Sequence, residues 1–209
     1  MEWLRNIRQK KEIAPPLEIL KELPSAVVLV GIECSGKTSP CKDQLSALGF
    51  SRISFDDEFE KAVVEANRSS KKMIEALTIA KKSNEITVYY PKNKDEFEQY
   101  FLHKIFGIGI QKISRMVIEG KKASLDGINI LSDTRISIVK ALRKQGVKDI
   151  ACIWIDTPVD ECLKRFRKRG SEHSTRELTE DILRRHASQF EPPTASEGFD
   201  SILRIPFKI

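Results

Sequence analysis

The chain has 209 residues, of which 40% are hydrophobic and 32% are charged. This balance is typical of a globular protein long enough to bury a core, and it argues against a disordered chain. No run of about 18 apolar residues is present, which argues against a transmembrane helix, and we expect no membrane partner.

The net charge of +6 permits a polyanionic partner without requiring one. The four cysteines show no C-x-x-C spacing, so we expect free thiols in a reducing compartment. The first residues, MEWLRNIRQKKE, lack the apolar segment of a secretory signal. We therefore expect an intracellular protein, in the cytoplasm or the nucleus.

A phosphate-binding loop is predicted after the first buried strand. Residues 1–24 have the pattern of a charged, helical lead-in, and the apolar run at 26–30 then predicts a central strand. The next residues, GIECSGKTS at 31–39, match G-x-x-x-x-G-K-[ST], and a predicted helix follows them. In such a loop, backbone N–H groups at a helix N-terminus bind phosphate groups.

This motif predicts a site for ATP or another nucleoside triphosphate with Mg²⁺. We expect Lys37 to reach the β- and γ-phosphates and Thr38 to give its hydroxyl to Mg²⁺. Glu33 is unusual here, because a carboxylate inside the loop opposes anion binding unless it points away from the phosphates. The residues predicted to bind the nucleotide are Gly31, Ser35, Gly36, Lys37, Thr38 and Ser39.

Two acidic residues follow the next predicted strand. SRISF at 51–55 predicts this strand, which ends at Asp56 and Asp57. Phosphoryl transfer to a hydroxyl needs a group that accepts its proton and holds the nucleophile in line. We predict Asp56 as this base and Asp57 as a substrate-binding residue.

The middle of the chain is predicted to be mostly helical at 58–119, with 86–90 as either strand or loop. The pattern KKASLDGIN at 121–129 then predicts a strand that ends at Asp126 and is followed by Asn129. An amphipathic helix at 134–146 and a buried strand at 150–156 come next. We expect Asp126 and Asn129 to bind substrate, because ligands of parallel sheets lie at the carboxyl ends of the strands.

An arginine-rich helix follows the strand at 150–156. The segment KRFRKRG at 164–170 places five cations in seven residues. Arginine side chains stabilise the charge on a transferring phosphoryl group, so we predict a lid that closes over the triphosphate. In this lid Arg165 is predicted to bind the nucleotide, and Arg167 and Arg169 are predicted to be catalytic.

Strands that alternate with helices predict a three-layer α/β/α domain with a mainly parallel sheet, as in P-loop NTPases, and a last strand at 201–207. We expect one domain over 1–209, in which 58–118 is a longer, mostly helical segment that could bind the acceptor. The three histidines show no metal spacing and are interpreted as surface or packed residues.

The C-terminal third resembles the kinase domain of eukaryotic polynucleotide kinase-phosphatases. The similarity is carried by QFEPPTASEGFDSILRIPF at 189–207, by the strand ending in Asp126 and Asn129, by the helix with Arg135, and by the lid arginines. With GIECSGKTS and ISFDD it covers roughly 22–57 and 119–207. The resemblance implies a Mg²⁺-assisted kinase that moves the γ-phosphate of an NTP to the 5′-hydroxyl of DNA or RNA. It also implies Asp56 as the base and Arg135 as a substrate-binding residue.

The chain departs from this family at three places, and two alternative functions follow. Glu33 and Cys34 replace a usual Pro-Gly, Phe55 replaces an arginine, and 58–118 matches no family segment. One alternative is a P-loop kinase for a small molecule or a tRNA-linked acceptor. The other is a nucleotide-binding module without phosphotransfer. The sequence leaves open the acceptor, ATP against GTP, and the oligomeric state.

Overall fold

The computed structural model describes residues 24–37, 40–58, 61, 78–80, 87–89, 94–169 and 178–207. The lead-in predicted for 1–24 lies outside these ranges except for its last residue. Thr38 and Ser39 also lie outside them, as does 170–177 after the arginine-rich helix.

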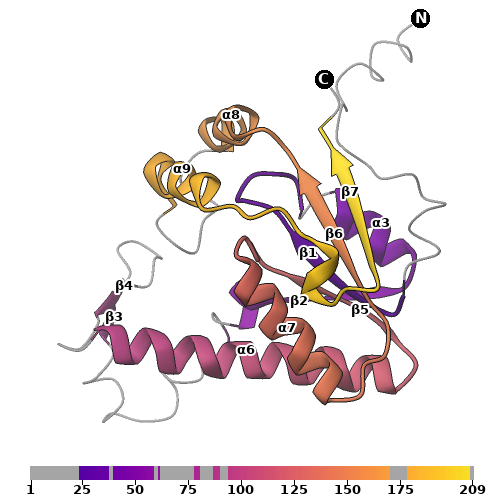
Figure 1. Cartoon of the computed structure of the whole chain (residues 1–209). Coiled ribbons are helices and arrows are strands. Elements are labelled where there is room, and N and C mark those ends of the chain that lie inside the picture. Colours follow the sequence, from indigo (N-terminus) through magenta and orange to yellow (C-terminus); the bar gives the residue numbers. More distant parts are fainter. Residues whose placement is uncertain are drawn as a thin grey trace, which may run out of the picture.

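Five parallel strands form the central sheet in the order β2-β5-β1-β6-β7 (Figure 1). Strand β1 is central, and all five of its residues are buried. This agrees with the continuous apolar run that predicted it, because a strand covered on both faces needs no polar side chain. The strands are β1 (Ala26–Val30), β2 (Phe50–Ser54), β5 (Lys122–Asp126), β6 (Ile150–Asp156) and β7 (Ser201–Pro206).

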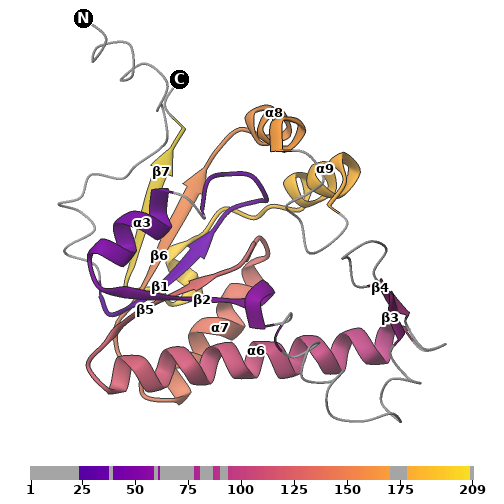
Figure 2. The same cartoon turned by 180° about the vertical axis from the view of Figure 1, so that it is seen from behind.

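Helices cover both faces of the sheet, which gives the predicted three layers. The long α6 (Lys94–Ile118) and α7 (Ser132–Lys144) lie on one face, and α3 (Pro40–Ala47) lies on the other (Figures 1 and 2). Side chains of β1 alternate between the two cores. Val28 packs with residues of α6 and α7, whereas Val27 packs with Leu45 of α3.

Two further helices lie beyond the carboxyl ends of β1 and β6: α8 (Val159–Arg169) and α9 (Glu180–Ser188) (Figure 1). A small apolar cluster joins them to the loop after β1, with Ile32 packed near Leu163 and Leu183. Helix α9 is absent from our sequence prediction. It begins at Thr179, whose side chain accepts a hydrogen bond from the backbone N–H of Ile182 and caps the helix.

The middle of the chain differs in part from the prediction. Within the described residues, helix is found at 94–118 as predicted, but β3 (Thr78–Ala80) and β4 (Thr87–Tyr89) form an antiparallel pair. The helical prediction for 78–80 is therefore wrong, and the strand option at 86–90 is confirmed for 87–89. β-branched residues in both segments favour a strand once a partner is available. No helix in the described part of the chain is both long and apolar enough to cross a membrane.

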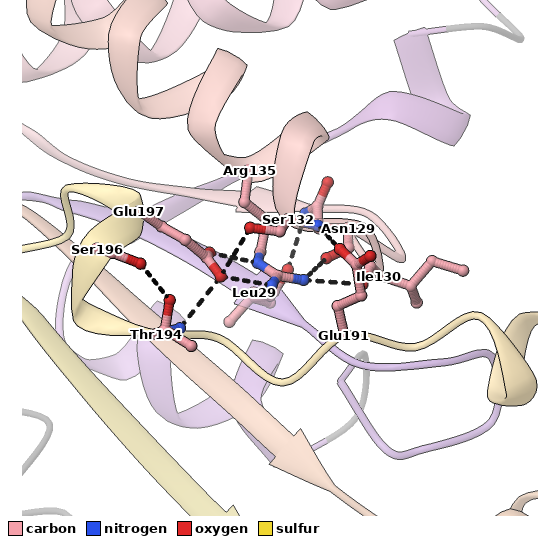
Figure 3. Close-up of polar contacts among 9 residues, drawn as sticks. All are labelled: Leu29, Asn129, Ile130, Ser132, Arg135, Glu191, Thr194, Ser196 and Glu197. Atoms are coloured by element: carbon pink, nitrogen blue, oxygen red, sulfur yellow. Dashed lines mark hydrogen bonds and ion pairs between the residues drawn. The ribbon is translucent and has the colours of Figure 1, made fainter.

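A buried ion pair joins α7 to the C-terminal segment (Figure 3). Arg135 is 0% exposed, and its Nε and Nη2 donate to the two carboxylate oxygens of Glu197 at 2.6 and 2.7 Å. Its Nη1 donates to the carbonyl oxygens of Asn129 and Ile130. Glu197 in turn accepts the backbone N–H of Thr194 in a capping box.

This geometry corrects the expectation that Arg135 binds substrate. Every nitrogen of its guanidinium is engaged inside the protein, and none of its surface reaches solvent. The segment around Glu197, which carries the resemblance to polynucleotide kinases, therefore has a structural role in this protein. Asn129 is also buried, and its Nδ2 donates to the carbonyl oxygen of Leu29 at 2.8 Å, which fastens the end of β1. Its role in binding substrate stays a prediction.

We expect Glu197→Gln to lower the free energy of unfolding by about 3–5 kcal/mol, because it leaves the charge of Arg135 buried without its partner. Chemical denaturation measured by circular dichroism tests this. The matched control is Glu119→Gln, which removes one partner of an exposed pair with Lys121 and should change the stability far less. Equal effects of the two substitutions would contradict the account.

The same pair predicts how stability depends on pH. Burial alone would raise the pKa of Glu197, but the hydrogen bonds and the charge of Arg135 outweigh it and hold that pKa below its usual value. A carboxylate with a lowered pKa stabilises the fold above its unfolded pKa of about 4.3 and loses this contribution as the pH falls. The difference in unfolding free energy between the wild type and Glu197→Gln should therefore shrink below about pH 4. A difference that stays constant across this pH range would be the contrary result.

Candidate active site

The loop after β1 closes around the side chain of Lys37. The Lys37 Nζ donates to the carbonyl oxygens of Gly31 at 2.5 Å and of Ile32 at 2.7 Å, and the residue is only 7% exposed. Thus the cation predicted to meet the β- and γ-phosphates lies inside the loop. The predicted Mg²⁺ ligand Thr38 and its neighbour Ser39 lie outside the described residues.

Close packing explains Gly31 of the motif, and a positive φ explains Gly36. A Cβ on Gly31 would come within 2.9 Å of the carbonyl oxygen of Ile155 and of the Ser35 Oγ, and its φ of +151° disfavours a side chain. A Cβ on Gly36 would lie 3.0 Å from the guanidinium of Arg165, at a φ of +104°. The loop therefore needs glycine at both positions.

Neighbouring elements hold the loop through the carbonyl oxygen of Ser35. It accepts a hydrogen bond from the hydroxyl of Thr157 at 2.7 Å and another from Arg165 Nη1 at 2.9 Å. Arg165 also donates to the carbonyl oxygen of Cys34. The predicted nucleotide-binding residues Ser35 and Arg165 are thus in contact with each other at the loop.

Glu33 points toward α9. Its Oε1 lies 2.8 Å from Nδ1 of His186, and both side chains are 20% exposed. Within the described residues, the Oε2 of Glu33 is buried without a hydrogen-bond partner, and the direction of this carboxylate relative to bound phosphates stays a prediction. Its field nevertheless reaches Lys37. Burial lowers the pKa of that lysine, and the charges of Asp126 and Glu33 are among those that oppose the shift.

Three predicted carboxylates gather at the ends of β2 and β5. These strands are neighbours, and Ser54 is paired with Asp126. Arg52 Nε donates to Oδ2 of Asp126 at 2.7 Å, and Arg52 Nη1 donates to Oδ2 of Asp57 at 2.6 Å. Asp56 is exposed beside them, and its charge also acts on Lys37.

Phe55 connects the site to α6. Its ring stacks on Phe106 with centroids 5.9 Å apart, and it approaches Gly109 so closely that a Cβ there would meet it at 2.8 Å. One turn further, the buried carboxylate of Glu58 accepts a hydrogen bond from Lys112 of α6. Helix α6 is thus fastened to the segment that carries Asp56 and Asp57.

The lid arginines lie in different environments. Arg165 lies against the loop, whereas Arg167 is exposed and forms two hydrogen bonds with Glu180 of α9, at 2.6 and 2.9 Å. In this arrangement Glu180 occupies Nε and Nη2 of Arg167, and the catalytic role of Arg167 stays a prediction. The side chain of Arg169 lies outside the described part of the structure, and its catalytic role stays a prediction.

A family model for an AAA domain matches residues 27–193, which includes the loop, both acidic strand ends and the lid. The chain belongs to the AAA domain family.

Solved structures with a similar fold include several kinases. A gluconokinase from Sinorhizobium meliloti 1021 has a TM-score of 0.54 and 14% identity over 90% of this chain and 85% of its own. Kti12 of Chaetomium thermophilum, solved with ADP-AlF3, has a TM-score of 0.54 and 11% identity over 88% and 89%. The Pnkp1/Rnl/Hen1 RNA repair complex has a TM-score of 0.51 and 16% identity over 80% of this chain and 44% of that one. These likenesses show a P-loop, kinase-like α/β fold.

The residues of this AAA domain fit a magnesium ion held together with nucleotide phosphates. Mg²⁺ prefers oxygen ligands, keeps several waters, and is commonly bound through one or two carboxylates plus phosphate oxygens. The carboxylates of Asp56 and Asp126 lie near the loop, and Thr38 follows Lys37 in the sequence. The described residues contain no cluster of three or more side chains able to hold a metal by themselves.

Three side-chain contacts of this AAA domain could not be predicted from the sequence. Arg52 lies in the middle of a strand, His186 is 153 residues from Glu33, and Thr157 is 122 residues from Ser35. No local spacing connects such residues. The capping pattern Thr-Glu-Asp at 179–181 was an available signal for α9.

We expect Glu33→Gly to keep or improve the affinity of this AAA domain for nucleotide, because it removes a negative charge near the phosphates. Titration with a fluorescent ATP analogue measures the Kd. Glu33→Gln is the matched variant, since it removes the charge and retains an oxygen that can face His186. Lys37→Ala should abolish binding in the same assay. A loss of affinity of about tenfold in both Glu33 variants, equal to about 1.4 kcal/mol, would show that the carboxylate itself supports binding.

Proposed function

We propose that this AAA domain is a polynucleotide 5′-hydroxyl kinase that transfers the γ-phosphate of an NTP to the 5′-OH of DNA or RNA. The observation that carries the proposal is that two groups of predicted site residues lie at the same edge of the sheet. The loop around Lys37 follows β1, and the carboxylates of Asp56, Asp57 and Asp126 follow β2 and β5 at the same edge. The charges of Asp126 and, more weakly, Asp56 act on Lys37, which supports the proposal that these groups share one site.

The proposed chemistry is an in-line displacement at the γ-phosphorus. Asp56 orients the 5′-hydroxyl and accepts its proton as the new O–P bond forms and the bond to the β-phosphate oxygen breaks. Lys37 and Arg165 stabilise negative charge on the phosphates, because their cations are already held at the loop before reaction. Bound Mg²⁺ supplies further neutralisation of the phosphate oxygens.

The polynucleotide acceptor is supported by sequence resemblance and by surface charge. The resemblance covers 119–207, which includes the lid and the strand that ends at Asp126. Helices α8 and α9 pack near the loop and carry exposed cations, and such cations favour the phosphate backbone of a nucleic acid. They are Lys164, Arg167, Lys168, Arg184 and Arg185.

A second candidate is a kinase for a small hydroxyl compound. Phe55 favours it, because an apolar ring packed on α6 replaces an arginine that would otherwise meet an acceptor phosphate. The acceptor assay below separates the two candidates, since only the first predicts label on an oligonucleotide.

Wild-type protein should transfer label from γ-labelled ATP or GTP to 5′-OH DNA or RNA oligonucleotides in the presence of Mg²⁺. We expect Lys37→Ala and Asp56→Ala to abolish this activity and to retain the fold, as checked by circular dichroism.

Matched controls are Lys148→Ala and Asp149→Ala. Both residues are exposed and precede β6, at the edge of the sheet opposite the loop. The controls should retain activity. Near-normal turnover of either site variant would overturn the assigned roles, and nucleotide binding without any labelled oligonucleotide would overturn the function.

A further inference from the structure

Arg52 is the cation that connects two predicted acidic site residues. It lies on β2, and its side chain is 25% exposed. One nitrogen binds Asp126, whose side chain is 7% exposed at the end of β5, and another binds Asp57, whose side chain is 49% exposed in the turn after β2. Arg52 therefore connects this turn to the buried end of the neighbouring strand β5, at Asp126.

The turn held in this way also carries Asp56. Asp57 follows it directly, so the tether at Asp57 fixes the backbone one residue from the predicted base. The backbone N–H of Asp57 lies 3.3 Å from the Ser54 Oγ, a long contact that adds little restraint. On the other side, the ring of Phe55 packs against Gly109 and Phe106. Asp56 is thus held between an apolar anchor at Phe55 and an ionic anchor at Asp57.

Arg52 and Lys37 also line a shared cavity of about 210 Å³ on the α3 face of the sheet, together with Ser46 and Ser124. The two cations therefore lie on one side of the sheet. Asp126 accepts a hydrogen bond from Arg52, and its charge acts on Lys37. Charges alternate across this edge from Lys37 to Asp126, Arg52 and Asp57. The two hydrogen bonds of Arg52 fix these carboxylates in place without a bound ligand.

We propose that Arg52 is a positioning residue for phosphotransfer, which sets the place of Asp56 relative to Lys37 by bridging Asp57 and Asp126. The inference rests on the proposed kinase function and deepens it. A planar guanidinium with separate N–H groups can bridge two carboxylates, whereas a lysine ammonium acts as a single point of charge. The geometry of Arg52, in addition to its charge, is therefore the property that matters.

The test compares Arg52→Gln, Arg52→Lys and Asp57→Asn with the wild type. A displaced base lowers the rate of transfer more than it weakens binding, so we expect kcat to fall about 10- to 100-fold in Arg52→Gln, with the KM values for NTP and oligonucleotide within about threefold. Arg52→Lys should recover only part of kcat. Asp57→Asn should lower kcat in the same direction, and its effect should not add to that of Arg52→Gln.

The matched control is Arg143→Gln. Arg143 is also paired with an aspartate, Asp200, but it lies at the end of α7 away from the loop. Its kcat should stay near the wild-type value. Thermal melts of every variant separate a loss of folded protein from a loss of rate.

Each outcome supports or overturns the proposal. A wild-type kcat in Arg52→Gln, full recovery by Arg52→Lys, or additive losses in the double variant would overturn the bridging role. A KM for the oligonucleotide that rises while kcat is unchanged would show that Arg52 contacts the acceptor. If the wild type labels no oligonucleotide, the kinase proposal fails, and the positioning of Asp56 is then tested on NTP hydrolysis, in which water replaces the acceptor. A wild type without either activity overturns both.

Discussion

The buried ion pair between Arg135 and Glu197 supports the base of the phosphate-binding loop. Arg135 fixes the carbonyl oxygens of Asn129 and Ile130 as well as the carboxylate of Glu197. The segment 128–130 in turn holds the start of the loop. Asn129 donates a hydrogen bond to the carbonyl oxygen of Leu29, and the N–H of Gly31 donates to the carbonyl oxygen of Ile128. A charge without access to water must be compensated, so the pair fixes α7, the C-terminal segment and the end of β1 together.

Next to this segment, the candidate site is a row of side chains whose charges alternate in sign. Lys37 is held by loop carbonyl oxygens, Asp126 lies in its field, and Arg52 joins Asp126 to Asp57. Hydrogen bonds and charges of the two aspartates outweigh burial and raise the pKa of Arg52 above its usual value, so it remains charged throughout. Hydrogen bonds therefore hold Lys37 and Arg52 in place before any substrate arrives.

Local patterns in the sequence predicted most of the sheet and the half of the site that lies in the loop. The apolar run at 26–30, the motif at 31–39 and the strand ends at Asp56 and Asp126 each carry their signal within a few residues. The family model and the parallel strand order confirm the predicted fold.

Pairings between distant residues could not be predicted in this way. Arg135 and Glu197 are 62 residues apart, and Arg52 and Asp126 are 74 apart. An arginine in an amphipathic helix gives no sign that its guanidinium will be buried. Nothing in the local sequence therefore opposed the substrate-binding role that the family resemblance implied for Arg135. Strand β3 was missed for a related reason, since a short β-branched segment becomes a strand only when β4 pairs with it.

The central claim is that the loop of Lys37 and the carboxylate of Asp56 form one site for a polynucleotide 5′-end. A single-turnover competition tests it most directly: wild-type protein is loaded with γ-labelled ATP and Mg²⁺ and is then mixed with equal amounts of a 5′-OH oligonucleotide, its 5′-phosphorylated form and a set of small polyols. Label that appears on the terminal 5′-nucleotide of the first oligonucleotide alone is the result this account predicts. Label on a polyol, or none on any acceptor, would contradict it.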